Sequence, residues 1–240
     1  MQAQHIVALS RSIMLPRRAL IIGGFLFAAL PSEPAAAGEP VAVVEQIAAP
    51  STGLQFMDFV EVGRLIKLRA GETMSLGYFG SCIQEQIVGG SVQIGTNQSN
   101  VDGGEVQRQQ VECDGGRLQL DASSNDSSGV LILRSIEPAT TTASGGDGAL
   151  PAAELTLFHT QPIIGISIPN SLLRIERLDA SEPRLEMRIE ARYLDLATTA
   201  NALTPGGLYK AEAVGHSITF RVDPKAAAGG GPVIGRLLYL

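Results

Sequence analysis

The chain of 240 residues has no tryptophan, two cysteines, three histidines and three lysines, and aromatic residues make up only 5% of it. Its 18 basic residues are outnumbered by 24 acidic ones, which gives a net charge of −6. Nucleic-acid binding depends on clusters of Lys and Arg that contact phosphates. Because the sequence is acidic and has few lysines, it argues against a nucleic-acid partner.

Catalytic and cofactor motifs are also scarce. No G-x-S-x-G elbow marks a nucleophilic serine, and no lysine stands near the glycine pairs as a phosphate-binding loop would require. The chain has neither a CxxC pair nor a closely spaced histidine pair for zinc. The segment 121–129 offers oxygen ligands in Asp121, Asn125 and Asp126 but lacks the spacing of a Ca²⁺ loop, so a polar hairpin loop is favoured over a calcium site. We therefore expect no metal and no cofactor.

An apolar segment near the N-terminus has the features of an export signal. Arg17 and Arg18 precede residues 19–30, "ALIIGGFLFAAL", which have the length of a signal-peptide core and are too short to span a bilayer as a helix. Small residues at Ala35 and Ala37 then form an A-x-A cleavage pattern. A twin-arginine signal and a buried apolar helix of the mature domain are the alternatives.

We expect residues 1–37 to be removed on export, with Met1 or Met14 as the start of translation. The mature chain would then carry 15 basic and 23 acidic residues, a net charge of −8, after the loss of Arg11, Arg17, Arg18 and Glu33. No later segment approaches the roughly 18 apolar residues of a membrane helix. These features predict a periplasmic or secreted protein with no membrane span after cleavage.

The two cysteines, Cys82 and Cys113, both lie in the expected mature part. An oxidising compartment favours a disulfide between them. Closing a loop of about 30 residues constrains the unfolded chain by roughly 3–4 kcal/mol in the entropic model. A free reactive thiol and metal ligation remain the alternatives to a crosslink between adjacent or facing strands.

Short alternating segments indicate β-structure throughout the N-terminal half. Three glycine pairs, Gly89–Gly90, Gly103–Gly104 and Gly115–Gly116, recur 14 and then 12 positions apart, and we interpret them as hairpin turns because glycine tolerates positive φ. No amphipathic helix pattern is evident, so the predicted fold class is all-β. The predicted strands are 54–60, 64–70, 73–79, 91–95, 105–111, 117–121 and 129–136.

A change of composition predicts a domain boundary. Residues 137–152 are rich in Thr, Ser, Gly, Ala and Pro without apolar periodicity, as in a linker or a long exposed loop. We therefore expect two small β domains, 38–136 and 153–240. In the second, "RLEMRIEA" at 184–191 alternates as a strand with one solvent-exposed face, and 208–222 predict a hairpin turning near Gly215.

The segment "LTPGGLY", residues 203–209, contains a recognisable corner. Leu203, Pro205, Gly206 and Tyr209 resemble the L-x-P-G-x-x-Y corner of fibronectin type III and related immunoglobulin-like sandwiches. The resemblance covers about 20 residues. It implies an immunoglobulin-like β-sandwich for 153–240, with the Tyr209 hydroxyl bonded to backbone near Leu203.

The N-terminal half resembles another family. Residues 62–82, "VGRLIKLRAGETMSLGYFGSC", with Gly63, Gly71 and Leu76, are similar to the FecR-type β domains of bacterial envelope proteins, in which a short β module often precedes an immunoglobulin-like one. A FecR regulator typically keeps a membrane helix and a cytoplasmic segment. This chain is expected to lose its only apolar anchor, so direct signalling across the membrane is not implied.

Two functional hypotheses follow. The favoured one is a non-catalytic envelope module, a binding or sensor/scaffold protein that contacts a protein or polymer partner through loops or a sheet edge. The alternative is a small secreted hydrolase or thiol enzyme that uses Cys82 or His159. His216, at the expected hairpin turn, is interpreted as an exposed residue. Because no nucleophile motif accompanies His159, we expect that the protein is not an enzyme.

Overall fold

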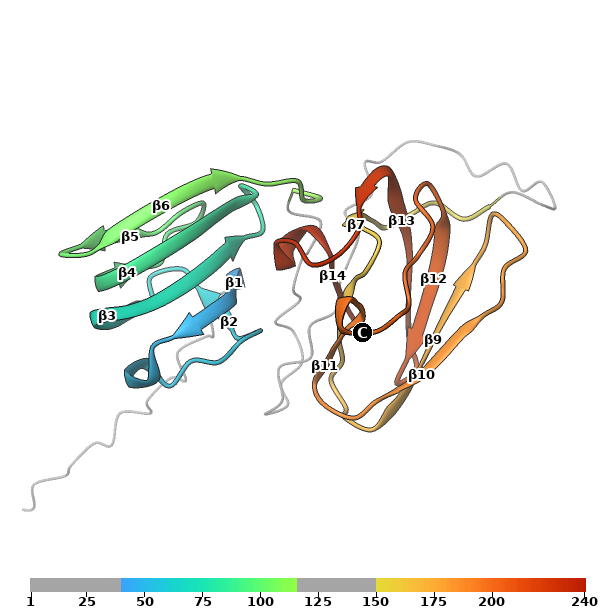
Figure 1. Ribbon diagram of the computed structural model, residues 1–240, viewed down its shortest axis with the longest axis horizontal. Coiled ribbons are helices and arrows are strands. Elements are labelled where there is room, and N and C mark those ends of the chain that lie inside the picture. The colour runs from blue at the N-terminus through green and yellow to red at the C-terminus, as the bar shows by residue number, and fades with distance from the viewer. Residues whose placement is uncertain (1–39, 116–149) are drawn as a thin grey trace, which may run out of the picture. The chain divides into compact units, whose positions relative to one another are not determined.

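The computed structural model describes residues 40–115 and 150–240, and both ranges are built from β-strands with a few short 3-10 helices (Figure 1). The all-β prediction is therefore confirmed. The expected signal peptide, the strands predicted at 117–121 and 129–136, the acidic segment 121–129 and nearly all of the linker 137–152 lie outside the described residues.

The N-terminal range forms a six-stranded sheet in the order β2-β1-β3-β4-β5, with β6 also paired to β4 (Figure 1, blue to green). All of these pairs are antiparallel. One core cluster of this range contains Leu76, Ile87 and Val92. The strands are β1 (Pro40–Ala48), β2 (Phe59–Glu61), β3 (Leu65–Tyr78), β4 (Ile83–Gln93), β5 (Asn100–Asp102) and β6 (Glu105–Gln110), and the 3-10 helix η1 (Pro50–Thr52) follows β1.

Two of the three glycine pairs do not form the hairpin turns that the sequence predicted, and Gly116 of the third pair lies outside the described residues. Gly89 and Gly90 lie inside β4 with φ of 62° and 86°, and Gly103–Gly104 separates β5 from β6, which both pair with the same edge of β4. A Cβ on Gly104 would lie 2.2 Å from the carbonyl oxygen of Gly89. The two pairs are thus neighbours across the sheet, and glycine is required because the backbones approach closely.

Two strands that the sequence predicted separately form a single strand in the structure. Segments 64–70 and 73–79 form the single strand β3, whose pairing with β4 shifts register between Leu68 and Thr73. The predicted strand 91–95 overlaps only the end of β4, which begins at Ile83 and ends at Gln93. Two other predictions were wrong. β1 was not predicted, and most of 54–60 is a turn in which Met57 has a positive φ of 71°.

The C-terminal range forms a five-stranded sheet, β10-β9-β12-β13-β7, and a three-stranded sheet, β11-β8-β14 (Figure 1, yellow to red). Two pairs, β13 with β7 and β14 with β8, are parallel, and the other pairs are antiparallel. The strands are β7 (Leu155–His159), β8 (Ile163–Gly165), β9 (Ser171–Arg177), β10 (Leu185–Ile189), β11 (Tyr193–Asp195), β12 (Leu208–Ala213), β13 (His216–Ala227) and β14 (Leu237–Tyr239), with 3-10 helices η2 (Leu196–Thr198) and η3 (Val233–Gly235).

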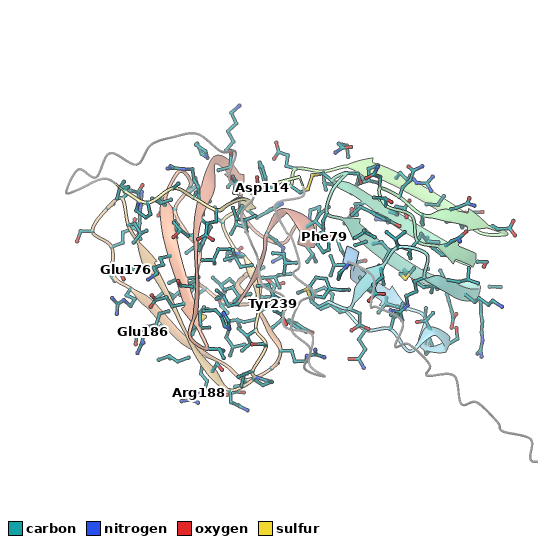
Figure 2. All side chains as sticks on the ribbon, turned by 180° about the vertical axis from the view of Figure 1, so that it is seen from behind. Phe79, Asp114, Glu176, Glu186, Arg188 and Tyr239 are labelled. Carbon is teal, nitrogen blue, oxygen red and sulfur yellow. A yellow bond between two sulfur atoms is a disulfide. The ribbon has the colours of Figure 1, made fainter. Side chains whose placement is uncertain are left out.

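Two local predictions for this range are confirmed. The segment "RLEMRIEA" contains β10, and its charged side chains are exposed; Figure 2 shows Glu186 and Arg188 on β10 and Glu176 on β9. The hairpin β12–β13 turns at Val214 and Gly215. Both sheets contribute to one core cluster, with Ile164 and Leu238 from the small sheet and Phe220 from the large one.

A third core cluster contains residues from both described ranges. It consists of Val43, Phe79, Ile163, Val233, Ile234 and Leu237, and we call it the seam. The seam lies within one compact unit that extends from Ala36 to Leu240. The division into domains 38–136 and 153–240 stays a prediction. The part of the chain that the structure describes holds no helix with the length and hydropathy needed to cross a membrane.

Candidate functional site

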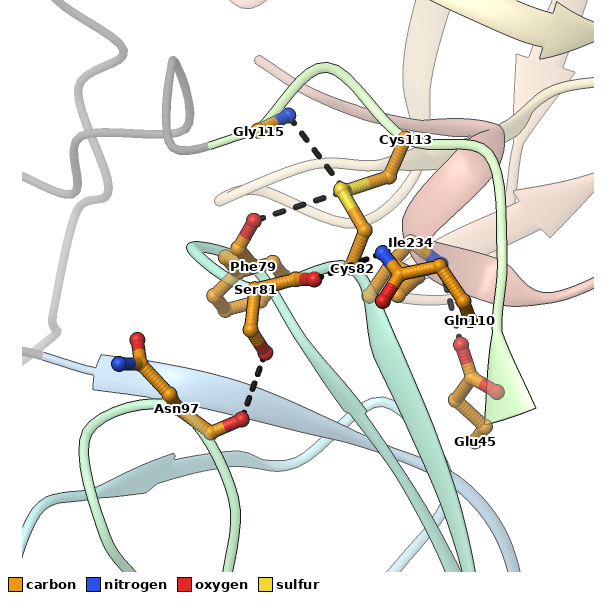
Figure 3. The surroundings of a disulfide bond; sticks show 9 residues. All are labelled: Glu45, Phe79, Ser81, Cys82, Asn97, Gln110, Cys113, Gly115 and Ile234. Carbon is orange, nitrogen blue, oxygen red and sulfur yellow. Dashed lines mark hydrogen bonds between the residues drawn. A yellow bond between two sulfur atoms is a disulfide. The ribbon is translucent and has the colours of Figure 1, made fainter. Parts of the chain in front are cut away.

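The two cysteines are joined in a disulfide, as predicted. Cys82 ends the turn between β3 and β4, and Cys113 follows β6, with the two Cα atoms 5.5 Å apart (Figure 3). The backbone continues this connection, because the Val111 N–H donates to the carbonyl oxygen of Cys82 at 2.9 Å. No free cysteine remains in the chain. In this oxidised form Cys82 has no free thiol that could act as a nucleophile.

Polar contacts support the disulfide from both sides (Figure 3). The Ser81 hydroxyl donates to the carbonyl oxygen of Asn97 at 2.6 Å, and the Gln110 amide donates to the carbonyl oxygen of Ser81 at 2.9 Å. The Gly115 N–H points at the Cys113 sulfur, 3.4 Å away. These contacts hold the disulfide in a packed part of the sheet. Such surroundings are typical of a disulfide with a structural role.

A buried carboxylate from β1 reaches η3 at the seam. Glu45 is 4% exposed and accepts a hydrogen bond from the Ile234 N–H at 3.1 Å and another from the Gln84 side chain. A Cβ on Gly77 would lie 2.5 Å from the Glu45 Oε1, so glycine makes room for the carboxylate. Burial raises the pKa of Glu45, and the hydrogen bonds from Gln84 and Ile234 only partly oppose that rise.

A second carboxylate, that of Asp195, forms an ion pair with Arg236, the residue that follows η3. Arg236 is 5% exposed and pairs with Asp195 through two contacts of 2.6 and 2.9 Å. Burial raises the pKa of Asp195, but the hydrogen bonds and charge of Arg236 and the Ala197 N–H outweigh burial and leave it below its usual value. Arg236 also donates to the carbonyl oxygens of Gln161 and Gly231, at 3.1 Å each.

A pocket of about 280 Å³ lies next to the seam. Phe56 meets Tyr193 edge to face, with ring centroids 5.1 Å apart, and Phe59 meets Tyr239 in the same way at 6.0 Å. Tyr239, labelled in Figure 2, lies against Gly165, where a Cβ would come within 2.6 Å of the ring. The walls of the pocket include Phe56, Met57, Asp58, Arg192, Tyr193 and Tyr239.

The pocket also contains charged and polar groups. Arg192 is exposed and makes no side-chain hydrogen bond or ion pair with the described residues. Asp58 accepts a hydrogen bond from the Gln55 N–H at 2.8 Å. Burial raises the pKa of the Tyr239 hydroxyl, and the charge of Arg192 opposes that rise. An open, aromatic pocket with a cation of this kind can bind a ligand that is partly apolar and partly anionic.

The two histidines of the expected mature chain lie in different environments. The His159 ring ends β7 and packs on Gly231, where a Cβ would come within 2.1 Å of it, and its Nδ1 is buried with no hydrogen-bond partner among the described residues. Burial, followed by the charge of Arg236, lowers the pKa of His159. His216 is exposed at the start of β13, as expected. The geometry of His159 is that of a ring packed against the backbone of Gly231.

The corner residues come together as the motif predicts. Tyr209 is buried, and its hydroxyl accepts a hydrogen bond from the Thr204 N–H at 2.8 Å, next to Leu203. Gly206, which follows Pro205 in the turn, has a φ of 80°. The Tyr209 ring also stacks on Phe220 with centroids 5.6 Å apart. The corner is therefore part of the core and carries no reactive group of its own.

The sequence did not predict the pocket. Phe56 was predicted to be part of a strand, whereas it meets Tyr193 across 137 positions of the chain. No local pattern signals such a pair. Within residues 40–115 and 150–240, no three His, Cys, Asp or Glu side chains gather in a way that could hold a metal ion.

Comparison with known proteins adds no family: no family model, curated protein or solved structure matches the chain.

Proposed function

We propose that the protein is an exported envelope module that binds a protein partner without catalysing a reaction. The observation that carries this proposal is the open pocket beside the seam, where aromatic rings accompany the unpaired guanidinium of Arg192. A concave site with apolar walls and a few polar groups is the usual form of a binding site. The expected export signal, the acidic composition and the disulfide support a location outside the cytoplasm.

We also propose that residues 153–240 are an immunoglobulin-like domain. In that fold a corner tyrosine begins strand F, whose neighbours are C and G, while B and E pair in the other sheet. Here Tyr209 stands near the start of β12, β9 and β13 flank β12, and β8 pairs with β11. The parallel pairs of β7 with β13 and of β8 with β14 are additions to the antiparallel pattern.

Fewer observations support the FecR-type resemblance of the N-terminal half than support the immunoglobulin-like domain. The six-stranded sheet of residues 40–110 agrees with a small β module that precedes a second β module. This order of domains favours a sensor or scaffold role in the envelope.

A photo-crosslinking experiment tests the binding function. A photoreactive amino acid replaces Tyr193 in the pocket or, as a control, Leu172 on β9; the two native side chains are 37% and 41% exposed. The proposal predicts a discrete adduct with a cellular partner from position 193 and none from position 172. The same adducts from both positions, or none from position 193, would contradict it.

Fractionation tests the export that the function requires. The intact mass of the protein from the periplasm is expected to correspond to a chain that starts near Gly38, because Ala35 and Ala37 form the cleavage pattern. Retention of residues 19–30 in a membrane fraction would contradict this expectation.

A further inference from the structure

The pocket is held rigidly on the side that comes from the N-terminal range. The Met57 N–H donates to the carbonyl oxygen of Val44 at 2.9 Å, and the Val44 N–H donates to the carbonyl oxygen of Asp58 at 2.8 Å. These bonds fix the turn 55–58 on β1 even though Met57 has a positive φ, a conformation that is uncommon for a residue with a side chain. Phe56 is therefore presented from a pre-organised turn, which lowers the entropic cost of binding.

Arg192, the cation of the pocket, differs from the other arginines of residues 150–240. The seven arginines of residues 150–240 include six whose side chains are engaged: Arg174, Arg177, Arg184 and Arg236 in ion pairs, and Arg188 and Arg221 in hydrogen bonds to backbone carbonyls. Arg192 alone in that range has no side-chain partner. Its backbone is nevertheless fixed, because its carbonyl oxygen accepts from the Ile166 N–H at 2.9 Å. The guanidinium is thus anchored at its base and free at its tip.

The charges indicate which anion fits. A guanidinium binds a carboxylate through two parallel hydrogen bonds. Asp58 also lines the pocket, and its negative charge would repel the second charge of a phosphate dianion more than it would disturb a monoanion. The charge balance therefore favours a carboxylate, with Arg192 as its partner.

The exposure of the walls indicates how the ligand continues. Tyr193 is 37% exposed and Arg192 is exposed, so the pocket opens to solvent on the side where the anion would bind. A small molecule is usually enclosed over most of its surface, whereas the end of a longer chain needs such an opening. The aromatic walls would then contact the side chain of the terminal residue.

We propose that this pocket binds the free C-terminal carboxylate of a partner polypeptide whose last side chain is aromatic. Arg192 pairs with the carboxylate, and Phe56, Tyr193 and Tyr239 contact the terminal ring. This assignment rests on the proposed binding function and specifies the part of the partner that the pocket recognises.

The test measures the binding of fluorescent pentapeptides to the mature, disulfide-bonded protein by anisotropy. The probe ends in phenylalanine with a free carboxylate, and its matched control ends in phenylalaninamide. We expect the amide to bind at least about tenfold more weakly, because it cannot form the charged pair. Equal affinity of the acid and the amide would overturn the proposal, and so would an acid peptide that does not bind.

Protein variants localise the effect. Arg192→Gln is expected to abolish the preference for the acid, whereas Arg188→Gln, a control at another arginine with an exposed position (Figure 2), should retain it. Circular dichroism melts of both variants establish that they are folded. An acid preference that survives in Arg192→Gln would overturn the role of this residue.

Two further comparisons distinguish a wrong ligand class from a wrong binding function. N-acetylphenylalanine, a small acid with the same end group, is expected to bind more weakly than the pentapeptide, and equal affinity would overturn the assignment to a chain end. If the pentapeptide fails while the adduct at position 193 still forms, the ligand class is wrong and the binding function stands. If both fail, the proposed function is wrong as well.

Discussion

Burial raises the pKa of both carboxylates beside η3, but their net pKa shifts are opposite. Glu45, from the N-terminal range, accepts hydrogen bonds from uncharged groups, the Ile234 N–H and the Gln84 amide, and its pKa is raised. Asp195, from the C-terminal range, has the guanidinium of Arg236 as a partner, and its pKa is lowered. The comparison shows that the partner, and not burial alone, decides the direction in which the pKa of a buried carboxylate shifts.

The largest effect is expected from Asp195→Asn. The amide can still cap η2, where the Asp195 Oδ1 accepts from the Ala197 N–H at 2.9 Å, but it leaves the guanidinium of Arg236 buried without a counter-charge. Removing one partner of a buried ion pair costs about 3–5 kcal/mol, so the free energy of unfolding should fall by about this amount in urea melts. The matched control Glu186→Gln removes a half-exposed partner of Arg174 and should change stability by less than about 1 kcal/mol. Equal losses in both variants would contradict the argument.

Removal of the disulfide should have the next largest effect. It links residues 31 positions apart near the Glu45 side of the seam, and the double variant Cys82→Ala/Cys113→Ala should lose about 3–4 kcal/mol on the entropic model. Urea melts of the parent and the variant measure the difference. If reduction of the parent with a thiol reagent leaves the melt unchanged, the crosslink does not constrain the chain in this way.

A smaller loss is expected from Tyr209→Phe in the C-terminal core. The variant keeps the ring on Phe220 but leaves the Thr204 N–H without its acceptor. An unsatisfied buried donor costs about 1–3 kcal/mol. A denaturant melt that gives the variant the stability of the parent would remove the main support for the immunoglobulin-like corner.

The smallest effect on stability at neutral pH is expected from Glu45→Gln. The direction in which this effect changes with pH nevertheless tests the raised pKa of Glu45. The folded-state pKa of Glu45 lies above its ordinary value of 4.5. The unfolded chain therefore deprotonates first, and the parent loses stability as the pH rises from about that value through the folded pKa. The neutral amide removes this loss, and Glu45→Gln should become more stable relative to the parent as the pH rises. Parallel melts over this pH range measure the difference, and a difference that does not change with pH would be incompatible with the raised pKa.

Asp195 has the opposite sign in the same titration. Its folded-state pKa lies below its ordinary value of 3.8, so its contribution to stability is present above that value and is lost as the pH falls through the folded pKa. The stability that depends on Asp195 should therefore disappear only in strongly acidic solution.

The features that could be predicted from the sequence depend on local chemistry. The disulfide follows from two cysteines in a chain with an expected export signal, and the Tyr209 hydrogen bond follows from a corner of seven residues. Gly89, Gly90 and Gly103 have the positive φ that was expected, but they do not lie in the hairpin turns that were predicted for them. Positive φ shows that the backbone is unusual, and it does not distinguish a turn from a close approach inside a sheet.

The features that could not be predicted depend on two segments that meet in space. β1 was missed because Val43 packs in the seam while Ala42 and Val44 pack in the other cluster, so the strand is buried on both faces and its sequence does not alternate. The pocket combines residues 55–59 with Arg192, Tyr193 and Tyr239. Neither range alone contains a pattern that indicates a binding site.

The most direct test of the binding function is photo-crosslinking at position 193 in cells, in the parent background and with Arg192→Gln or Arg188→Gln. The account predicts a discrete adduct in the parent and with Arg188→Gln, and its loss with Arg192→Gln. Adducts of the same size and yield in all three backgrounds would contradict the account.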